Sequence, residues 1–246
     1  MCTLILGLGI LGPGSLLLGA NRDESPQRPA TEPMVLAEDP RVVGGRDLLS
    51  GGTWLAIREA SFVTALMNRR PSGDDRRDPK TFRSRGLLCL DAASDSHLDG
   101  ALGLVARDSY APCTLVGVGV DGDAWTLEAG PGKPRVRPIA RGWHVITHQD
   151  VDDVNEPRTR WILEDIAEKR PGSRAEAFDL MAEYLRWHGD ETRPAVCLHR
   201  EVFPTVSSTL LALGDVREGP QYRQASGPPC VTPYQDHTSL LTGEDS

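Results

Sequence analysis

The sequence predicts an α+β fold in which two sheets form a sandwich with helices on its outer faces. Three observations predict it. Short apolar runs of strand length come first, separated by glycine and proline turns; helical periodicity replaces them at 157–169 and 174–187; strand patterns return from residue 194. A parallel β/α fold would alternate strands with helices throughout, so the sandwich is favoured.

The first expected element is a β-hairpin. Two apolar runs, 2–8 and 15–20, are joined by Leu11-Gly12-Pro13-Gly14, a sequence rich in turn residues. If the runs pair as antiparallel strands, the end of the second strand lies beside the start of the first. Asn21-Arg22-Asp23 would then lie next to Cys2.

The remaining elements are expected from the same periodicities. Ser84 and Ser173 are candidate N-caps of helices. We find no linker or internal repeat, so the chain is interpreted as one domain over residues 1–246. Further strands are expected at 34–36, 41–43, 53–58, 62–67, 113–120, 124–129, 136–139, 143–147, 194–198, 206–213 and 221–225, and further helices at 84–93 and 98–105.

Composition narrows the class of function. The net charge of −8 argues against a nucleic-acid partner, because phosphate binding needs concentrated Lys and Arg. Five cysteines without a Cys-x-x-Cys motif fit a reducing compartment, and the expected location is the cytoplasm. No apolar run reaches the ~18 residues of a membrane span. The expected partner is a small molecule, and a homo-oligomer is left open.

A cysteine directly follows the initiator methionine. If Met1 is removed, Cys2 carries both a thiol and a free α-amine, the pairing of nucleophile and base that N-terminal nucleophiles use. A thiol also needs partners that hold it and favour its thiolate. Arg22 and Asp23 are suitable, because a cation favours the thiolate and a carboxylate can hold the ammonium. An ordinary terminal cysteine beside a surface ion pair is the structural alternative.

These residues carry a resemblance. The chain resembles the NRDE, or TANGO2-like, family, which is similar to N-terminal nucleophile hydrolases of the choloylglycine hydrolase and penicillin V acylase type. That resemblance implies a four-layer αββα sandwich with two mainly antiparallel sheets, and cleavage of linear amide C–N bonds. The motifs are Met1-Cys2-Thr3, Asn21-Arg22-Asp23-Glu24, Gly44-Gly45-Arg46-Asp47-Leu48, Gly51-Gly52-Thr53-Trp54, Asn68-Arg69-Arg70 and Ser84-Arg85-Gly86.

The resemblance also implies which residues form the site. At some of these positions, this chain has a different residue from the one that the family pattern leads us to expect. Hydrolases of this type have an arginine where this chain has Ala20. The resemblance therefore assigns a catalytic role to Asp23 more directly than to Arg22. Val206 stands where TANGO2-like chains often have an arginine, for which Arg200 is a possible substitute. His148 lies where an oxyanion-stabilising asparagine is expected. Candidate catalytic residues are Cys2, Arg22, Asp23, Asn68 and His148, and candidate substrate-binding residues are Asn21, Arg46, Trp54, Arg69 and Ser207.

Several of these residues have plain structural alternatives, and metal ligands are not expected. Trp54 could belong to a core, and Asn68 could cap a turn. His144 and His148 would lie ~13 Å apart along a strand, and Cys197-Leu198-His199 is interpreted as an isolated pair.

The leading hypothesis is an amidohydrolase or acyltransferase that acts on a small amide or acyl substrate and needs no cofactor. The alternative is a non-catalytic TANGO2-like protein that handles haem or lipid, in which case haem would be its ligand.

Overall fold

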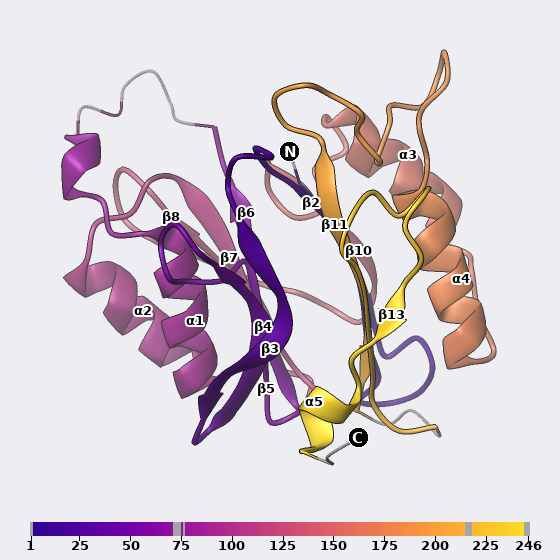
Figure 1. The fold of residues 1–246 in the computed structure, drawn as a ribbon, viewed down its shortest axis with the longest axis horizontal. Helices are drawn as coiled ribbons and strands as arrows, with labels where there is room; N and C mark the ends of the chain where they lie inside the picture. Colours follow the sequence, from indigo (N-terminus) through magenta and orange to yellow (C-terminus); the bar gives the residue numbers. More distant parts are fainter. Residues whose placement is uncertain (1, 71–74, 76, 215–217, 244–246) are drawn as a thin grey trace. The chain divides into compact units, whose positions relative to one another are not determined.

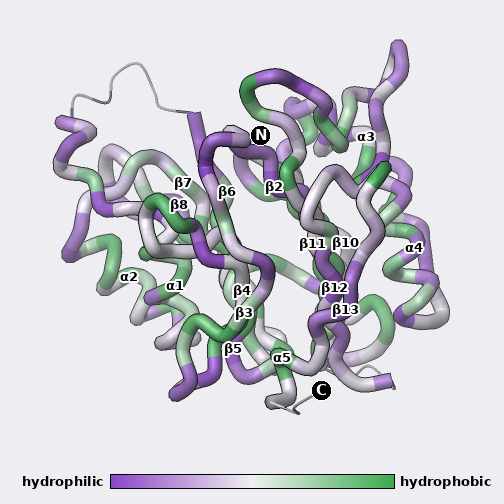
Figure 2. The backbone as a smooth tube through the Cα atoms, viewed as in Figure 1, coloured by the Kyte–Doolittle hydropathy of each residue, from purple (hydrophilic) through white to green (hydrophobic). Residues whose placement is uncertain are grey.

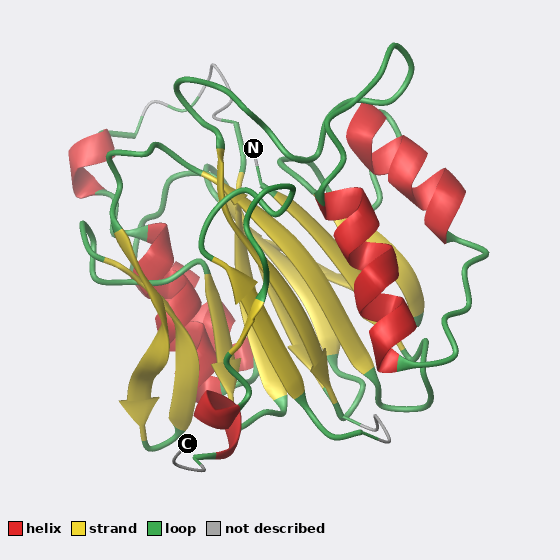
Figure 3. Ribbon diagram, turned by 45° about the vertical axis from the view of Figure 1, so that its right-hand side comes forward, coloured by secondary structure: helices red, strands yellow, loops and turns green. Residues whose placement is uncertain are grey.

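The computed structural model describes residues 2–70, 75, 77–214 and 218–243. The chain divides into two compact units. The first combines Met1–Gln27 with Ala140–Ser246, and the second is Arg28–Ile139. Each unit contains one sheet with a pair of helices packed on it (Figures 1 and 3). The first unit also contains the short helix α5 (Ser239–Thr242). All pairings between the named strands are antiparallel, so the α+β class with antiparallel sheets is confirmed.

The first unit has a six-stranded sheet in which the first two strands of the chain are adjacent interior strands. The expected hairpin is present, with Thr3 opposite Asn21. Gly9, Gly12 and Gly14 in its turn adopt positive φ, which L-residues rarely do. In spatial order the strands are β10 (Gly142–Ile146), β1 (Thr3–Leu8), β2 (Leu16–Asp23), β11 (Thr205–Leu213), β12 (Gln221–Ala225) and β13 (Gln235–Asp236).

Helices α3 (Pro157–Ile166) and α4 (Arg174–Leu185) pack on one face of this sheet. Ser173 caps α4 as expected, accepting from the backbone N–H of Glu176 at 3.2 Å. Hydrophobic and hydrophilic residues alternate along α4 (Figure 2), as expected of a helix with one buried face. Its apolar face closes a core built on residues that include Ile5, Leu17, Phe178, Met181 and Leu210.

The second unit has a seven-stranded sheet in simple sequence order. Helices α1 (Arg85–Asp95) and α2 (Leu98–Arg107) cover it. Ser84 occupies the N-cap position of α1, but its side chain makes no capping hydrogen bond. The strands are β3 (Ala30–Glu38), β4 (Arg41–Asp47), β5 (Leu55–Arg58), β6 (Phe62–Asn68), β7 (Cys113–Gly119), β8 (Ala124–Ala129) and β9 (Arg135–Pro138), and a 3-10 turn spans Pro79–Thr81.

The glycine-rich motifs of this unit are sites of close backbone approach. A Cβ on Gly52 would lie 2.2 Å from the carbonyl carbon of Gly86, and the N–H of Thr53 donates to the Gly86 carbonyl at 3.0 Å. The Gly-Gly-Thr-Trp and Ser-Arg-Gly motifs therefore meet directly. A Cβ on Gly45 would lie 2.4 Å from the Trp54 ring, so this pair is also packed in contact.

Three expectations about elements need correction. Residues 194–198 are not a strand: Val196 and Cys197 both donate to the single carbonyl of Trp187 at 2.9 Å, a loop arrangement rather than a ladder. The strands expected at 136–139 and 143–147 do not extend one sheet, because β9 pairs with β8 and β10 pairs with β1. The strand expected at 34–36 is the middle of the longer β3, and the strand expected at 41–43 is the start of the longer β4.

Among the residues that the structure describes, no helix combines the length and the apolar character needed to cross a bilayer. The interpretation of residues 1–246 as one domain stays a prediction.

Candidate active site

Cys2 and Asp23 lie side by side at one end of the β1–β2 hairpin. The backbone N–H of Asp23 donates to the Cys2 sulfur at 3.4 Å, and the thiol lies 3.7 Å from the Asp23 carbonyl oxygen. The β1–β2 register explains this contact, because Thr3 pairs with Asn21, which places Cys2 beside the end of β2. The expected meeting of residues twenty-one positions apart is confirmed. Met1 lies outside the described residues.

The surroundings of Cys2 keep its thiol protonated. Burial raises the pKa of the thiol above its ordinary value, and the negative charge of Asp23 raises it further. The positive charge of Arg22 lowers this pKa, but the net shift is upward. Cys2 is therefore a thiol at neutral pH, and its reaction as a nucleophile needs a base to accept the proton.

The Asp23 carboxylate is held by Thr205 at the start of β11. Thr205 Oγ1 donates to Asp23 Oδ1 at 2.7 Å and accepts from the backbone N–H of Leu198 at 2.8 Å. Burial raises the pKa of the Asp23 carboxyl, and the hydrogen bond from Thr205 opposes that rise. The sequence analysis passed over Thr205, which contacts Asp23 from 182 positions away.

Arg158 provides a buried cation beside this pair. It is the second residue of α3, only 5% exposed, and its Nη1 donates to Thr3 Oγ1 at 2.8 Å. Burial lowers the pKa of its guanidinium, while the charge of Asp23 raises it. A cation in the first turn of a helix opposes the helix dipole. An arginine in the first turn of a predicted helix is therefore unfavourable, and this is the feature of the sequence that indicates a special role for Arg158.

Three further candidates lie at the same end of this sheet. Arg22 is 9% exposed and pairs with Ser207 across β2 and β11, at a register shift between Thr205 and Ser207. His148 is 8% exposed and follows β10, whose Ile146 pairs with Leu4. Continued by two residues, this register would bring position 148 opposite position 2. The sheet therefore gathers these candidates, and their roles stay predictions.

Asn21 ties the hairpin to the helical layer. Its Nδ2 donates to the carbonyl of Leu185, at the end of α4, at 2.8 Å and to that of Val196 at 3.2 Å. Its buried Oδ1 has no hydrogen-bond partner among the described residues. The amide nitrogen is therefore structural, and the oxygen is the atom through which the predicted substrate contact could act.

The other four candidates lie in the second unit, and three of them contact other residues of that unit. Arg69 donates to Thr114 at 3.2 Å. Arg46 donates to the Gly51 carbonyl at 3.1 Å, and Trp54 packs on Gly45. Asn68 is exposed at the end of β6. These contacts give Arg46, Arg69 and Trp54 structural roles, and substrate binding by the four stays a prediction.

Cys197 and His199 are not an isolated pair. His188 and Cys230 join them, and one potential ligand atom from each of the four residues lies within 4.8 Å of the others. The four residues span 43 positions in irregular segments with no regular spacing, so no local motif in the sequence indicates the group. The expectation that no metal binds this chain is therefore reconsidered below.

Comparison with known proteins identifies the family of the sequence and proteins of similar fold. The family described as Transport and Golgi organisation 2 (TANGO2) matches residues 1–157. No curated protein matches the chain. Among solved structures, a Caenorhabditis elegans N-acylethanolamine-hydrolyzing acid amidase ortholog is 13% identical, with a TM-score of 0.59, over 85% of this chain and 92% of that one.

Two bacterial structures cover the whole chain. A C2A mutant of conjugated bile acid hydrolase from Clostridium perfringens is 14% identical, with a TM-score of 0.54, over 100% of this chain and 95% of that one. Penicillin V acylase from Agrobacterium tumefaciens is 13% identical, with a TM-score of 0.51, over 100% and 90%. These likenesses confirm the fold expected from the sequence, that of the N-terminal nucleophile hydrolases.

Proposed function

The chain belongs to the Transport and Golgi organisation 2 family, and on this premise we propose that it is an N-terminal-nucleophile amidohydrolase, or a related acyltransferase, with Cys2 as the nucleophile. The observation that carries the proposal is the contact of the Cys2 sulfur with Asp23. The Asp23 carboxylate is buried and held by Thr205, and Arg158 lies close by.

The proposed reaction begins after removal of Met1. The α-amine of Cys2 accepts the thiol proton, and the sulfur attacks the carbonyl carbon of the amide. The tetrahedral intermediate collapses, the C–N bond breaks, and the ammonium returns its proton to the departing amine. A water, deprotonated by the same α-amine, then hydrolyses the thioester and yields a carboxylic acid; a second amine in its place gives acyl transfer.

The side chains around Cys2 have separate roles in this proposal. Asp23 accepts a hydrogen bond from the α-ammonium formed when the thiol loses its proton, and Thr205 keeps the carboxylate in position. Arg158 balances the carboxylate charge in a buried environment, where an unpaired charge is costly. Backbone N–H groups, with His148, donate to the oxyanion of the tetrahedral intermediate.

The proposed substrate is a small molecule with a linear amide. The raised thiol pKa supports a mechanism in which the proton leaves only as the nucleophile attacks. The similar solved structures are named for hydrolysis of an N-acylethanolamine, hydrolysis of conjugated bile acids, and acylase action on penicillin V. Their low identity supports the fold alone, so the class of acyl group is for experiment to determine. Five free cysteines support the reducing, cytoplasmic location proposed with this function.

The test combines intact-mass spectrometry with a panel of N-acyl amides of increasing chain length. Protein purified without a tag is expected to lack Met1 and to gain the mass of one acyl group during turnover. Cys2→Ala should lose activity by a factor on the order of 10⁴ or more. Cys89→Ala, which removes a buried cysteine of the second unit, is the matched control and should keep it. Retained Met1, or full activity in Cys2→Ala, would refute the proposal.

A non-catalytic role in haem handling is the second candidate, favoured by family membership and by Ala20 and Val206 at positions where an arginine is expected. Titration with haemin separates the two. A Soret shift that is abolished in both Cys2→Ala and His148→Gln, in a protein that turns over none of the amides, would support this role.

A further inference from the structure

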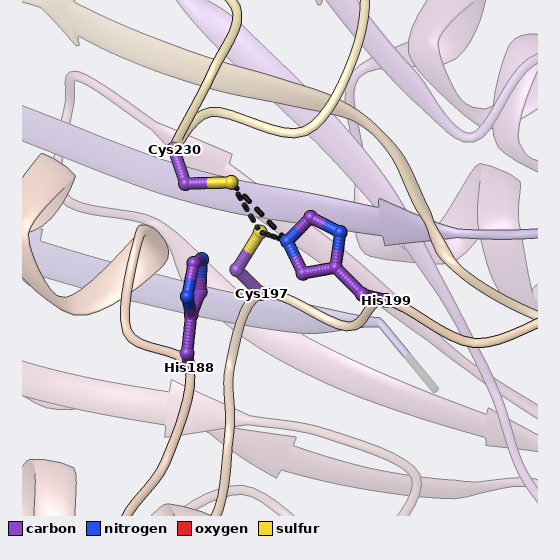
Figure 4. A group of neighbouring side chains, drawn as sticks. All are labelled: His188, Cys197, His199 and Cys230. Atoms are coloured by element: carbon purple, nitrogen blue, oxygen red, sulfur yellow. Dashed lines mark hydrogen bonds between the residues drawn. The ribbon is translucent and has the colours of Figure 1, made fainter.

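Four side chains from three segments of the first unit point toward a common centre (Figure 4). His188 follows α4, Cys197 and His199 lie in the loop before β11, and Cys230 lies in the irregular segment after β12. The rings of His188 and His199 meet edge to face, with centroids 4.9 Å apart. Two thiols and two imidazoles are the donor set of many zinc sites.

The distances among Cys197, His199 and Cys230 match tetrahedral zinc, and the His188 ligand atom lies within 4.8 Å of theirs. The two sulfurs lie 3.6 Å apart, and the Nε2 atom of His199 lies 3.8 Å from the Cys197 sulfur and 3.3 Å from the Cys230 sulfur. Zinc lies ~2.3 Å from sulfur and ~2.0–2.1 Å from nitrogen. Tetrahedral angles then place two sulfurs about 3.8 Å apart, and a sulfur and a nitrogen about 3.6 Å apart. A disulfide would instead bring the two sulfurs to about 2.05 Å.

We propose that His188, Cys197, His199 and Cys230 bind one zinc ion in a tetrahedral site. All four positions are filled by protein ligands, so the site is structural rather than catalytic. Soft thiolates and imidazoles together favour zinc over magnesium or calcium, which prefer oxygen ligands. Binding converts both thiols to thiolates and releases their two protons to solvent.

Backbone and side-chain hydrogen bonds already hold the three ligand-bearing segments together. The carbonyl of Trp187 accepts from Val196 and Cys197, both at 2.9 Å, which fixes the loop beside His188. Nε of Arg186 donates to the carbonyl of Pro229 at 3.1 Å, next to Cys230. A preorganised set of ligands loses less conformational entropy when the metal binds.

The zinc ligands adjoin the residues that hold the candidate active site. Cys197 lies between Val196, whose carbonyl accepts from Asn21 at 3.2 Å, and Leu198, whose N–H donates to Thr205 at 2.8 Å. The ion would therefore anchor the loop that positions Thr205, and through Thr205 the carboxylate of Asp23. The zinc site itself does not depend on the proposed hydrolysis.

The test uses the full chain without a tag, purified in reducing buffer free of chelators. Elemental analysis is expected to find one zinc per chain. After removal of zinc and addition of Co²⁺, the absorption spectrum should show the ligand-field bands of tetrahedral cobalt and a thiolate-to-cobalt charge-transfer band. Cys197→Ser and Cys230→Ser should each weaken zinc binding by at least tenfold and reduce the charge-transfer band.

Two controls keep the experiment independent of folding and of hydrolysis. Cys113→Ser replaces a buried cysteine of the second unit and should keep one zinc per chain. Cys2→Ala removes the proposed nucleophile and should also keep it. Circular dichroism establishes whether each variant is folded.

Three results would overturn the zinc site. The first is a folded Cys197→Ser/Cys230→Ser variant that retains stoichiometric zinc. The second is a cobalt spectrum with no thiolate band. The third is a Cys197–Cys230 disulfide in protein that, once reduced, takes up no cobalt.

Discussion

Replacing Thr205 by valine removes the hydroxyl that links the loop before β11 to Asp23, while keeping the shape of the side chain. Two buried groups lose this hydrogen bond: the N–H of Leu198, at 2.8 Å, and Oδ1 of Asp23, at 2.7 Å. A neutral hydrogen bond contributes about 1 kcal/mol and one to a charged group about 1.5–3 kcal/mol. We therefore expect Thr205→Val to lower the free energy of unfolding by about 2.5–4 kcal/mol.

The pH dependence of this loss identifies its cause. Burial raises the pKa of Asp23, so the folded protein keeps this proton to higher pH than the unfolded chain does, and stability falls as pH rises between the two pKa values. Removing the Thr205 hydroxyl raises the folded pKa further. Stability of Thr205→Val should therefore continue to fall at pH values where that of the native protein has levelled off.

Urea unfolding followed by circular dichroism, repeated from pH 5 to pH 8 (roughly the range of maximal stability), measures both quantities. The matched control is Thr209→Val on the same strand, which removes one neutral buried hydrogen bond, from Thr209 to Gln224 at 2.7 Å. It should cost about 1 kcal/mol at every pH. Thr205→Ser keeps a hydroxyl and should recover most of the stability. A loss in Thr205→Val that equals the Thr209→Val loss and does not change with pH would refute the role assigned to Asp23.

The remaining predictions concern Cys2, Arg158 and the packing of α4. In protein that still carries Met1, the raised pKa of the Cys2 thiol predicts that iodoacetamide modifies it more slowly at pH 8 (about the pKa of an ordinary thiol) than it modifies a free cysteine, and peptide mass spectrometry across pH measures the ratio. Equal rates would contradict this environment. Arg158→Met removes a buried guanidinium that donates to Thr3 Oγ1 at 2.8 Å and whose charge acts on Asp23. It should lower stability by about 1.5–3 kcal/mol, or Tm by roughly 3–12 °C in calorimetry; a shift below 2 °C (less than ~1 kcal/mol) would show that these interactions contribute little. Gly19→Ala places a Cβ 3.2 Å from Met181 and should cost about 1–3 kcal/mol. Its control, Gly103→Ala in α2, meets nothing within 4 Å and should stabilise by about 0.5–1 kcal/mol; equal effects in urea unfolding would contradict the packing argument.

Local patterns in the sequence predicted the hairpin, and the hairpin predicted the contact of Cys2 with Asp23. Strand period and turn residues act over a few positions, so the β1–β2 register followed from them. Thr205 and Arg158 reach the site from 182 and 155 positions away, measured to Asp23 and to Thr3. Only tertiary packing brings them there, and no local period indicates it.

The zinc ligands were missed for a related reason. All four lie in segments without regular secondary structure, and their spacing follows no metal-binding motif. The apolar residues at 194–198 predicted a strand, yet the backbone there is anchored by the Trp187 carbonyl and by Thr205. Apolar residues indicate that a segment is buried, but they do not specify which hydrogen-bond partners its backbone groups have.

The sheet that carries Cys2 is assembled from both ends of the chain, since β1 and β2 are flanked by β10 and β11. During synthesis at about 5–20 residues per second, roughly 10–40 s separate the emergence of the hairpin from that of Thr205. In that interval the second unit, which is continuous in sequence, can fold while the hairpin still lacks both neighbouring strands. Enzymes that act on nascent chains therefore have time to reach the residues ahead of Cys2 before the sheet closes around them.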